Sequence, residues 1–103
     1  MSAMRFYILD EHNIPVAAED ALTWAKWLEA NDERRVVART RVGECTVSTV
    51  FLGLDHSFGS IAPHLFETMV FPACEIQQRC SFWEEAEAQH SRIVESLKCA
   101  LLS

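Results

Sequence analysis

The N-terminal third of the chain changes from a strand pattern to a helix pattern. Residues 5–9 form a short run typical of a β-strand, which the polar and proline-containing segment 10–15 ends. From about Glu19, apolar residues recur three and four positions apart, which predicts a helix with Asp20 as its N-cap and an end at residues 31–32. The expected buried stripe of this helix is Ala21, Trp24, Ala25 and Leu28.

The next segment carries the clearest β signal and predicts a hairpin. Residues 35–41 and 44–52 alternate apolar and polar positions on either side of Val42 and Gly43. With these two residues as the loop, the expected facing pairs are Arg41 with Glu44, Arg39 with Thr46 and Val37 with Ser48. The apolar face is then Val36, Ala38, Thr40, Cys45, Val47, Thr49 and Phe51. The polar face is Arg35, Arg39, Arg41, Glu44, Thr46 and Ser48.

A loop and a strand with two apolar faces follow the hairpin. The glycine and proline content of residues 53–63 predicts a loop, and Pro72 ends the strand at 64–71. Phe66, Thr68 and Val70 lie on one face of that strand, and the other face is apolar around Glu67. Such a strand is either central and covered on both sides, or it reserves one face for a partner, for example in a homodimer.

The C-terminal part predicts a last strand and a long helix. Residues 75–79 are expected to form an edge strand, and Ser81 and Glu84 have the spacing of a capping box. The expected buried stripe of the helix is Trp83, Ala86, His90, Ile93, Val94, Leu97 and Leu101. We therefore expect an α+β fold in one domain, residues 1–103, with an antiparallel sheet of about four to five strands and two helices packed on it.

Charge and hydropathy exclude some classes of protein. Fifteen acidic against nine basic residues give a net charge of −6, which argues against direct nucleic-acid binding, although an acidic surface can also mimic a phosphate backbone. The apolar runs are too short to span a membrane, and the N-terminus lacks the pattern of a signal peptide, so we expect a cytoplasmic protein. Cys45, Cys74, Cys80 and Cys99 lack zinc-site spacing and are expected to be reduced thiols.

Several polar residues are candidates for chemistry, each with a simpler structural interpretation. Asp55, His56 and Ser57 suggest a general base in a loop, but an ordinary turn is the favoured interpretation. His56, His64, Glu67 and His90 would suit a metal-dependent enzyme if the fold brought them together, but their spacing does not demand a metal site. Glu67 needs a cation or hydrogen-bond donors, and Arg39 is the expected partner. The sequence assigns no cofactor, metal ligand or catalytic residue.

Six segments of the chain resemble a family of small uncharacterised proteins from bacteriophages and bacterial prophages. They are residues 7–10, 23–27, 35–41, 47–59, 65–71 and 83–90. The most specific of them runs from Ser48 to His56, whereas Pro72-Ala73-Cys74 replaces the glycine-rich turn that is usual in the family. The resemblance implies a phage origin and carries no catalytic residue.

These observations favour a non-enzymatic accessory protein that binds a host or phage protein. One version is inhibition of a host defence complex, such as a CRISPR complex, by steric occlusion of a basic groove. Trp27 lies off the expected helix stripe and is an interface candidate. The full set of residues expected to contact a partner is Trp27, Arg35, Arg39, Arg41, Asp55, His56, Phe58, Glu84, Glu85 and Glu87. The alternatives are a small metal- or ligand-dependent enzyme centred on His56, His64 and Glu67, and a structural homodimer through 64–71.

Overall fold

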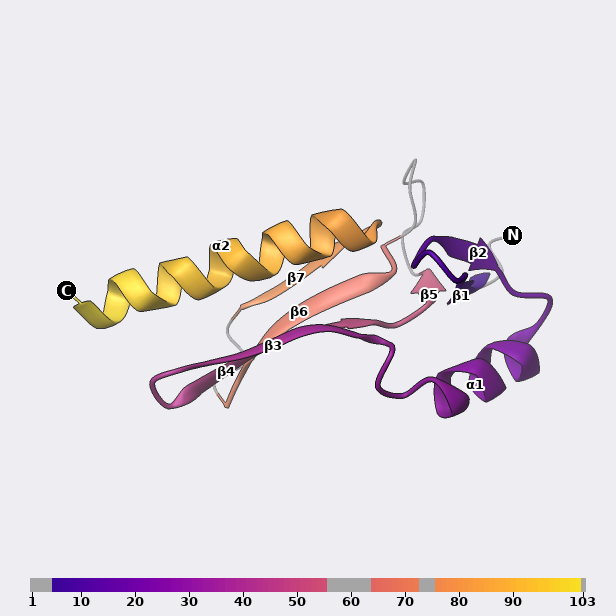
Figure 1. The fold of residues 1–103 in the computed structure, drawn as a ribbon, viewed down its shortest axis with the longest axis horizontal. Helices are drawn as coiled ribbons and strands as arrows, with labels where there is room; N and C mark the ends of the chain where they lie inside the picture. The colour runs from indigo at the N-terminus through magenta and orange to yellow at the C-terminus, as the bar shows by residue number, and fades with distance from the viewer. Residues whose placement is uncertain (1–4, 56–63, 73–75, 103) are drawn as a thin grey trace.

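The computed structural model describes residues 5–55, 64–72 and 76–102, and it has an α+β fold (Figure 1). The strands form two antiparallel sheets, ordered β2-β1-β5 and β3-β4-β6-β7, rather than the single sheet expected. The elements are β1 (Arg5–Leu9), β2 (Pro15–Ala17), α1 (Ala21–Ala30), β3 (Val36–Val42), β4 (Cys45–Phe51), β5 (Leu54–Asp55), β6 (Phe66–Phe71), β7 (Gln77–Cys80) and α2 (Trp83–Leu102).

The β3–β4 hairpin has the expected faces but not the expected register. Val42 pairs with Cys45, so the turn is Gly43-Glu44, one position later than expected. The reason is conformational: the first turn residue has a φ of 61°, which glycine adopts easily and valine does not. Each residue keeps its face because the facing partner changes by two positions, which equals the side-chain period of a strand.

An irregularity near the start of β3 changes the face of one residue. The register shifts between Val36 and Ala38, so Val36 pairs with Val50, which lies on the expected polar face. Val37 instead packs with the hydrophobic cluster around Phe51. The expected assignment of Val36 to the apolar face is therefore wrong.

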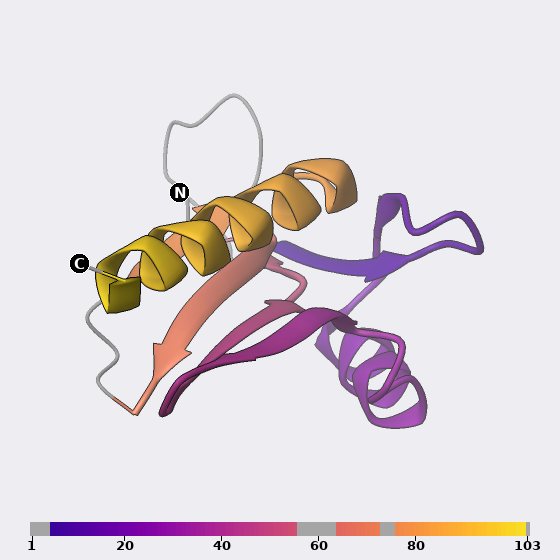
Figure 2. The same ribbon diagram turned by 60° about the vertical axis from the view of Figure 1, so that its left-hand side comes forward.

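β6 is a central strand, with β4 on one side and β7 on the other. Helix α2 packs against all four strands of this sheet and runs along one side of it in both views (Figures 1 and 2). The fully buried Phe66 and Thr68 face the helix, which explains one of the two apolar faces of β6. The face of β6 that carries Glu67, Met69 and Phe71 points away from α2, so a homodimer through this strand stays a prediction.

The N-terminal unit consists of the β1–β2 hairpin, α1 and β5. Asp20 caps α1 as expected, since its carboxylate accepts a hydrogen bond of 2.8 Å from the backbone N–H of Thr23. The expected α1 stripe is only partly right: Trp24 and Leu28 are half-buried, Ala21 and Ala25 are exposed, and Trp27 packs in place of Ala25.

The beginning of α2 differs from the expected capping box. The helix starts at Trp83, so the residue that reaches back is Glu85, not Glu84. A carboxylate oxygen of Glu85 accepts hydrogen bonds of 3.2 Å from the backbone N–H groups of Ser81 and Phe82. At the other end, the expected burial of Leu101 is wrong, because this side chain is 64% exposed.

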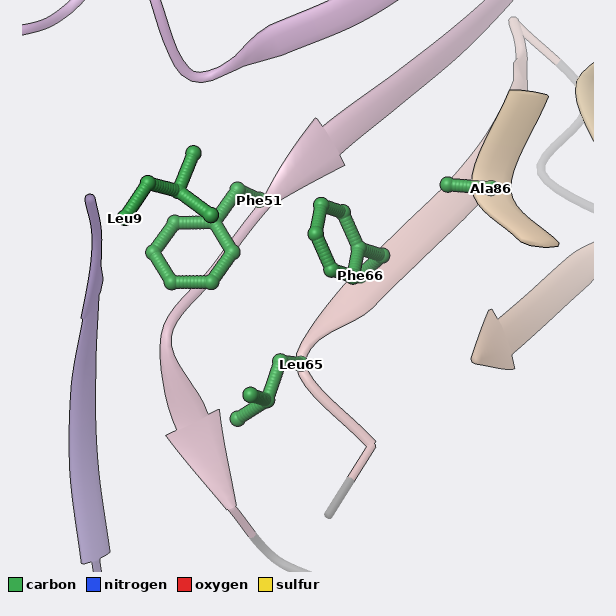
Figure 3. Packing of buried hydrophobic residues seen from close by; sticks show 5 residues of the cluster. All are labelled: Leu9, Phe51, Leu65, Phe66 and Ala86. Carbon is green, nitrogen blue, oxygen red and sulfur yellow. The ribbon is translucent and has the colours of Figure 1, made fainter. Parts of the chain in front are cut away.

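Two hydrophobic clusters form the core. The first, shown in Figure 3, contains Leu9, Phe51, Leu65, Phe66 and Ala86. The second contains Val42, Val47, Val70, Ile93 and Val94. Edge-on contacts of Phe51 with Trp27 and of Phe66 with Trp83 extend the first cluster toward both helices. None of the described helices is long and apolar enough to cross a membrane.

Candidate binding surface

One side of the four-stranded sheet is covered by α2, and the other side is what we call the open face. Thr40, Thr49 and Thr68 point toward α2, where they join hydrogen bonds with His90 and Gln89. Successive side chains of a strand point to opposite sides, so their neighbours point away from the helix. The open face consists of Val36, Arg39, Arg41, Thr46, Ser48, Val50, Glu67, Met69, Phe71, Gln77 and Arg79. The backbone of helix α1 approaches β1 rather than this sheet, and its Trp27 ring contacts Phe51 at the end of β4.

The strand register arranges the open face in three rows. The rows are Arg41–Thr46–Phe71, Arg39–Ser48–Met69–Gln77 and Val36–Val50–Glu67–Arg79. The two middle strands carry three apolar side chains on this face: Phe71 is 43% exposed, and Val50 and Met69 are half-buried. The other three side chains of the middle strands, Thr46, Ser48 and Glu67, are polar. The cationic side chains lie on the two outer strands.

Glu67 is paired, as expected for a buried carboxylate, but with a different arginine. Its Oε2 accepts hydrogen bonds from Arg79 Nε at 2.9 Å and from Gln77 Nε2 at 2.6 Å, both from β7. The prediction that Arg39 is the partner of Glu67 is wrong. Arg39 lies on β3 and Glu67 on β6, and β4 lies between these strands and separates them by about 10 Å. The pair therefore ties the edge strand β7 to the middle of the sheet.

Of the three arginines expected on the polar face of the hairpin, only Arg39 and Arg41 belong to β3. Arg35 precedes β3, and its guanidinium donates a 3.1 Å hydrogen bond to the carbonyl of Phe51 and lies 3.7 Å from Asp32. Arg39 and Arg41 are exposed, and neither forms an ion pair with a carboxylate in the described part of the chain. Arg41 does not face Glu44 as expected, since it pairs with Thr46 and donates to the carbonyl of Gly43.

The acidic residues of α2 lie on the far side of the molecule from these arginines. Glu84 and Glu87 are exposed on the helix that covers the opposite side of the sheet. Glu85 is engaged in capping. A single flat partner surface cannot contact the arginines and these acids together.

Trp27 and Asp55, the remaining predicted contact residues that the structure describes, lie outside the open face. Trp27 was expected off the packed stripe, but its ring contacts Phe51 at 5.8 Å and the Arg34 guanidinium lies over it. Asp55 was expected in a loop and instead lies in β5, where it pairs with Arg5 of β1. His56 and Phe58 fall outside the described residues.

Between α2 and the sheet lies a buried group of polar side chains, which we call the polar layer. Its members are Thr40, Thr49, Thr68, Gln89 and His90. Thr49 lies between Val47 and Phe51 along β4, so the layer separates the two hydrophobic clusters. Sequence reasoning missed Gln89 and the role of the threonines. The available signal was the recurrence of threonine on the otherwise apolar strand faces.

The polar layer has a consistent direction of hydrogen bonding. Gln89 Nε2 donates to the carbonyl of Gln78 and to Thr68 Oγ1, which fixes the orientation of its amide. When Thr68 donates to Thr49, and Thr49 to Nδ1 of His90, the proton of His90 lies on Nε2 and is donated to Thr40 Oγ1. Burial lowers the pKa of His90, in agreement with a neutral ring.

The structure does not bring the predicted metal-ligating residues together. Glu67 points to the open face, whereas His90 lies on the α2 side of the same sheet. His64 is exposed, and His56 lies outside the described residues. No cluster of three or more His, Cys, Asp or Glu side chains suited to a metal ion occurs in the segments that the structure describes.

A hollow of about 370 Å³ lies against the β1–β2 hairpin rather than on the sheet. Its lining residues are Arg5, Phe6, Tyr7, Ala17, Ala18 and Glu19. This set contains no histidine or cysteine, and we assign no chemistry to it.

Comparison of the chain with known protein families, with curated proteins and with solved structures finds no match. The resemblance to small phage proteins therefore stays a prediction.

Proposed function

We propose that this protein is a non-enzymatic binding protein that engages another protein through the open face of its four-stranded sheet. The observation that carries the proposal is the combination of side chains on that face. Exposed Phe71 and half-buried Met69 lie in the same rows as Arg41 and Arg39, one strand away, and no described carboxylate neutralises these arginines. Aromatic residues, methionine and arginine are the types enriched at protein interfaces.

The backbone that carries the open face is held in place, which suits a binding role. The side chains of the face belong to hydrogen-bonded strands, and α2 packs against the other side of the sheet. A surface that is ordered before binding loses little conformational entropy when a partner docks. A rigid sheet laid over a partner would act by steric occlusion.

The sequence resemblance extends this proposal to a biological setting. In an accessory protein of phage type, the occluded surface would belong to a host or phage complex, and a host defence complex is one version. Occlusion of a basic groove by the predicted contact residues Glu84 and Glu87 would use α2, on the opposite side of the molecule. The experiment below separates the two surfaces.

The test is a quantified pull-down from a bacterial lysate with three tagged proteins. They are the wild type, an open-face variant (Arg39→Glu with Arg41→Glu) and a matched α2 variant (Glu84→Lys with Glu87→Lys). All four altered side chains are exposed, so both variants are expected to fold. Glu85 is left unchanged because it caps α2.

A protein captured in equimolar amount by the wild type and the α2 variant, but lost with the open-face variant, supports the proposal. Loss with the α2 variant alone would assign binding to the acidic helix surface. Capture that is equal in all three proteins, or absent from all three, contradicts binding through the open face.

A further inference from the structure

The open face has a charge opposite to that of the whole molecule. It carries three arginines and one glutamate, whereas the complete chain has a net charge of −6. Arg79 is occupied by Glu67, so the cations available to a partner are Arg39 and Arg41 on β3. The available positive charge is therefore concentrated along one edge strand, and Ser48 and Thr46 of β4 lie between it and the apolar Met69 and Phe71 of β6.

We infer that the open face binds an acidic segment of a partner protein, an inference that rests on the proposed function. Arg39 and Arg41 are two positions apart on one side of a strand, so their side chains leave the backbone roughly 7 Å apart. Carboxylates at alternate positions of an extended segment have the same spacing. Such a segment pairs its acids with the two arginines and lays apolar side chains on Met69 and Phe71.

The arrangement of charges disfavours a second copy of the chain as the occupant. Contact between two identical open faces would oppose arginines to arginines, because the one acid on the face, Glu67, is already paired. Nucleic acid also fits less well. Two available arginines beside an apolar stripe provide few phosphate contacts, and the net charge of −6 repels a polyanion.

The experiment is a selection from a displayed library of random 12-residue peptides on the immobilised wild-type protein. Enriched peptides are expected to be net negative, with acids at alternate positions. The Kd of a synthetic enriched peptide is then measured by fluorescence anisotropy for three further variants. These are Arg39→Gln with Arg41→Gln, Met69→Asp, and Glu84→Gln with Glu87→Gln as the matched control.

We expect the double arginine variant to weaken binding roughly tenfold or more, since each arginine–carboxylate pair is charge-assisted. The control is expected to bind like the wild type, and added salt is expected to raise the Kd. Circular dichroism spectra and thermal midpoints verify that each variant is folded.

The other outcomes separate this inference from the function on which it rests. Enriched peptides that lack acids but lose binding with Met69→Asp would overturn the acidic occupant and leave the open face as the binding surface. Peptides whose binding is unaffected by every open-face variant, or no enrichment at all, would overturn both the acidic occupant and the open face as the binding surface.

Two further measurements test other occupants. Comparable binding of a mixed-sequence 12-nucleotide single strand would point to nucleic acid. A concentration-dependent dimer mass that the arginine variant alters would point to a second copy of this chain. Either result overturns the inference.

Discussion

Gly53 occupies the junction between the two sheets and tolerates no side chain. Its φ is 70°, its carbonyl accepts a 2.8 Å hydrogen bond from Tyr7, and the neighbouring carbonyl of Leu52 accepts from the Trp24 indole. A β-carbon here would lie less than 3.0 Å from the backbone oxygen of Tyr7 and from Trp24 Nε1. The obstacle is partly backbone, so it cannot rotate away.

We therefore expect Gly53→Ala to lower the free energy of unfolding by at least about 2 kcal/mol. Gly43→Ala is the matched control, because Gly43 has a similar φ of 61° but meets only the flexible Leu101 side chain at 3.0 Å. The control is expected to cost about 1 kcal/mol. Urea denaturation of the two variants measures the difference. Equal losses of stability would show that the positive φ alone, and not the lack of space for a β-carbon, accounts for glycine at position 53.

His90 gives the stability of the protein a pH dependence of known sign. Burial lowers its pKa in the folded state, whereas the unfolded chain binds a proton near the ordinary value of about 6.5. The unfolded state therefore holds more protons between the two values, and the free energy of unfolding decreases as the pH falls below about 6.5. A proton on Nδ1 would also remove the hydrogen bond that Thr49 donates there.

The measurement is the urea midpoint between pH 7.5 and pH 5 for the wild type and for His90→Gln. We expect a shallower pH dependence in the variant, although it is less stable throughout because the polar layer is broken. A slope unchanged by His90→Gln would mean that other groups cause the acid sensitivity.

At the scale of elements, the start of α2 is set by Glu85. Removing its carboxylate leaves two backbone N–H groups without their acceptor, so Glu85→Ala is expected to cost about 1 kcal/mol. Glu84→Ala is the neighbouring control and should cost less than about 0.5 kcal/mol, the size of a helix-dipole effect. Thermal unfolding of both variants shows which substitution lowers stability more. A larger loss for Glu84→Ala than for Glu85→Ala would mean that the helix begins one residue earlier.

Sequence patterns predicted elements well where the pattern was local. The Asp20 cap and the polar and apolar faces of β3 and β4 follow from neighbouring residues and are confirmed, apart from Val36 at the irregularity. The composition of residues 53–63 predicts one loop, whereas the structure has the short strand β5 at Leu54–Asp55. Two residues carry too little periodicity to predict a strand that depends on pairing with the distant β1.

The candidate site was less predictable because it depends on strand order. Placing Glu67 next to Arg39 required β3 and β6 to be neighbours, whereas β4 lies between them. The alternation did place Arg39 and Arg41 on one face, and Glu67 and Met69 on one side of β6. Only the order of the four strands joins these pairs into a single surface.

At the scale of the whole molecule, the two hydrophobic clusters differ in which elements contribute buried residues to them. Residues of β3, β4, β6 and α2 make up the buried part of the second cluster. The N-terminal unit contributes to the first cluster alone, mainly through Leu9, and α1 has no buried residue. Few buried contacts therefore hold β1, β2 and α1 to the rest of the protein.

The division of the core by the polar layer implies that the molecule opens in stages. Amide hydrogens of β1 and α1 are expected to exchange with deuterium through a local opening, whereas those of β4 and β6 exchange only on global unfolding. Native-state exchange should therefore be at least about tenfold slower in the two central strands. The first residues to be released would be those farthest from Ile93 and Val94, and the surface carrying Arg39 and Met69 would persist until the last step.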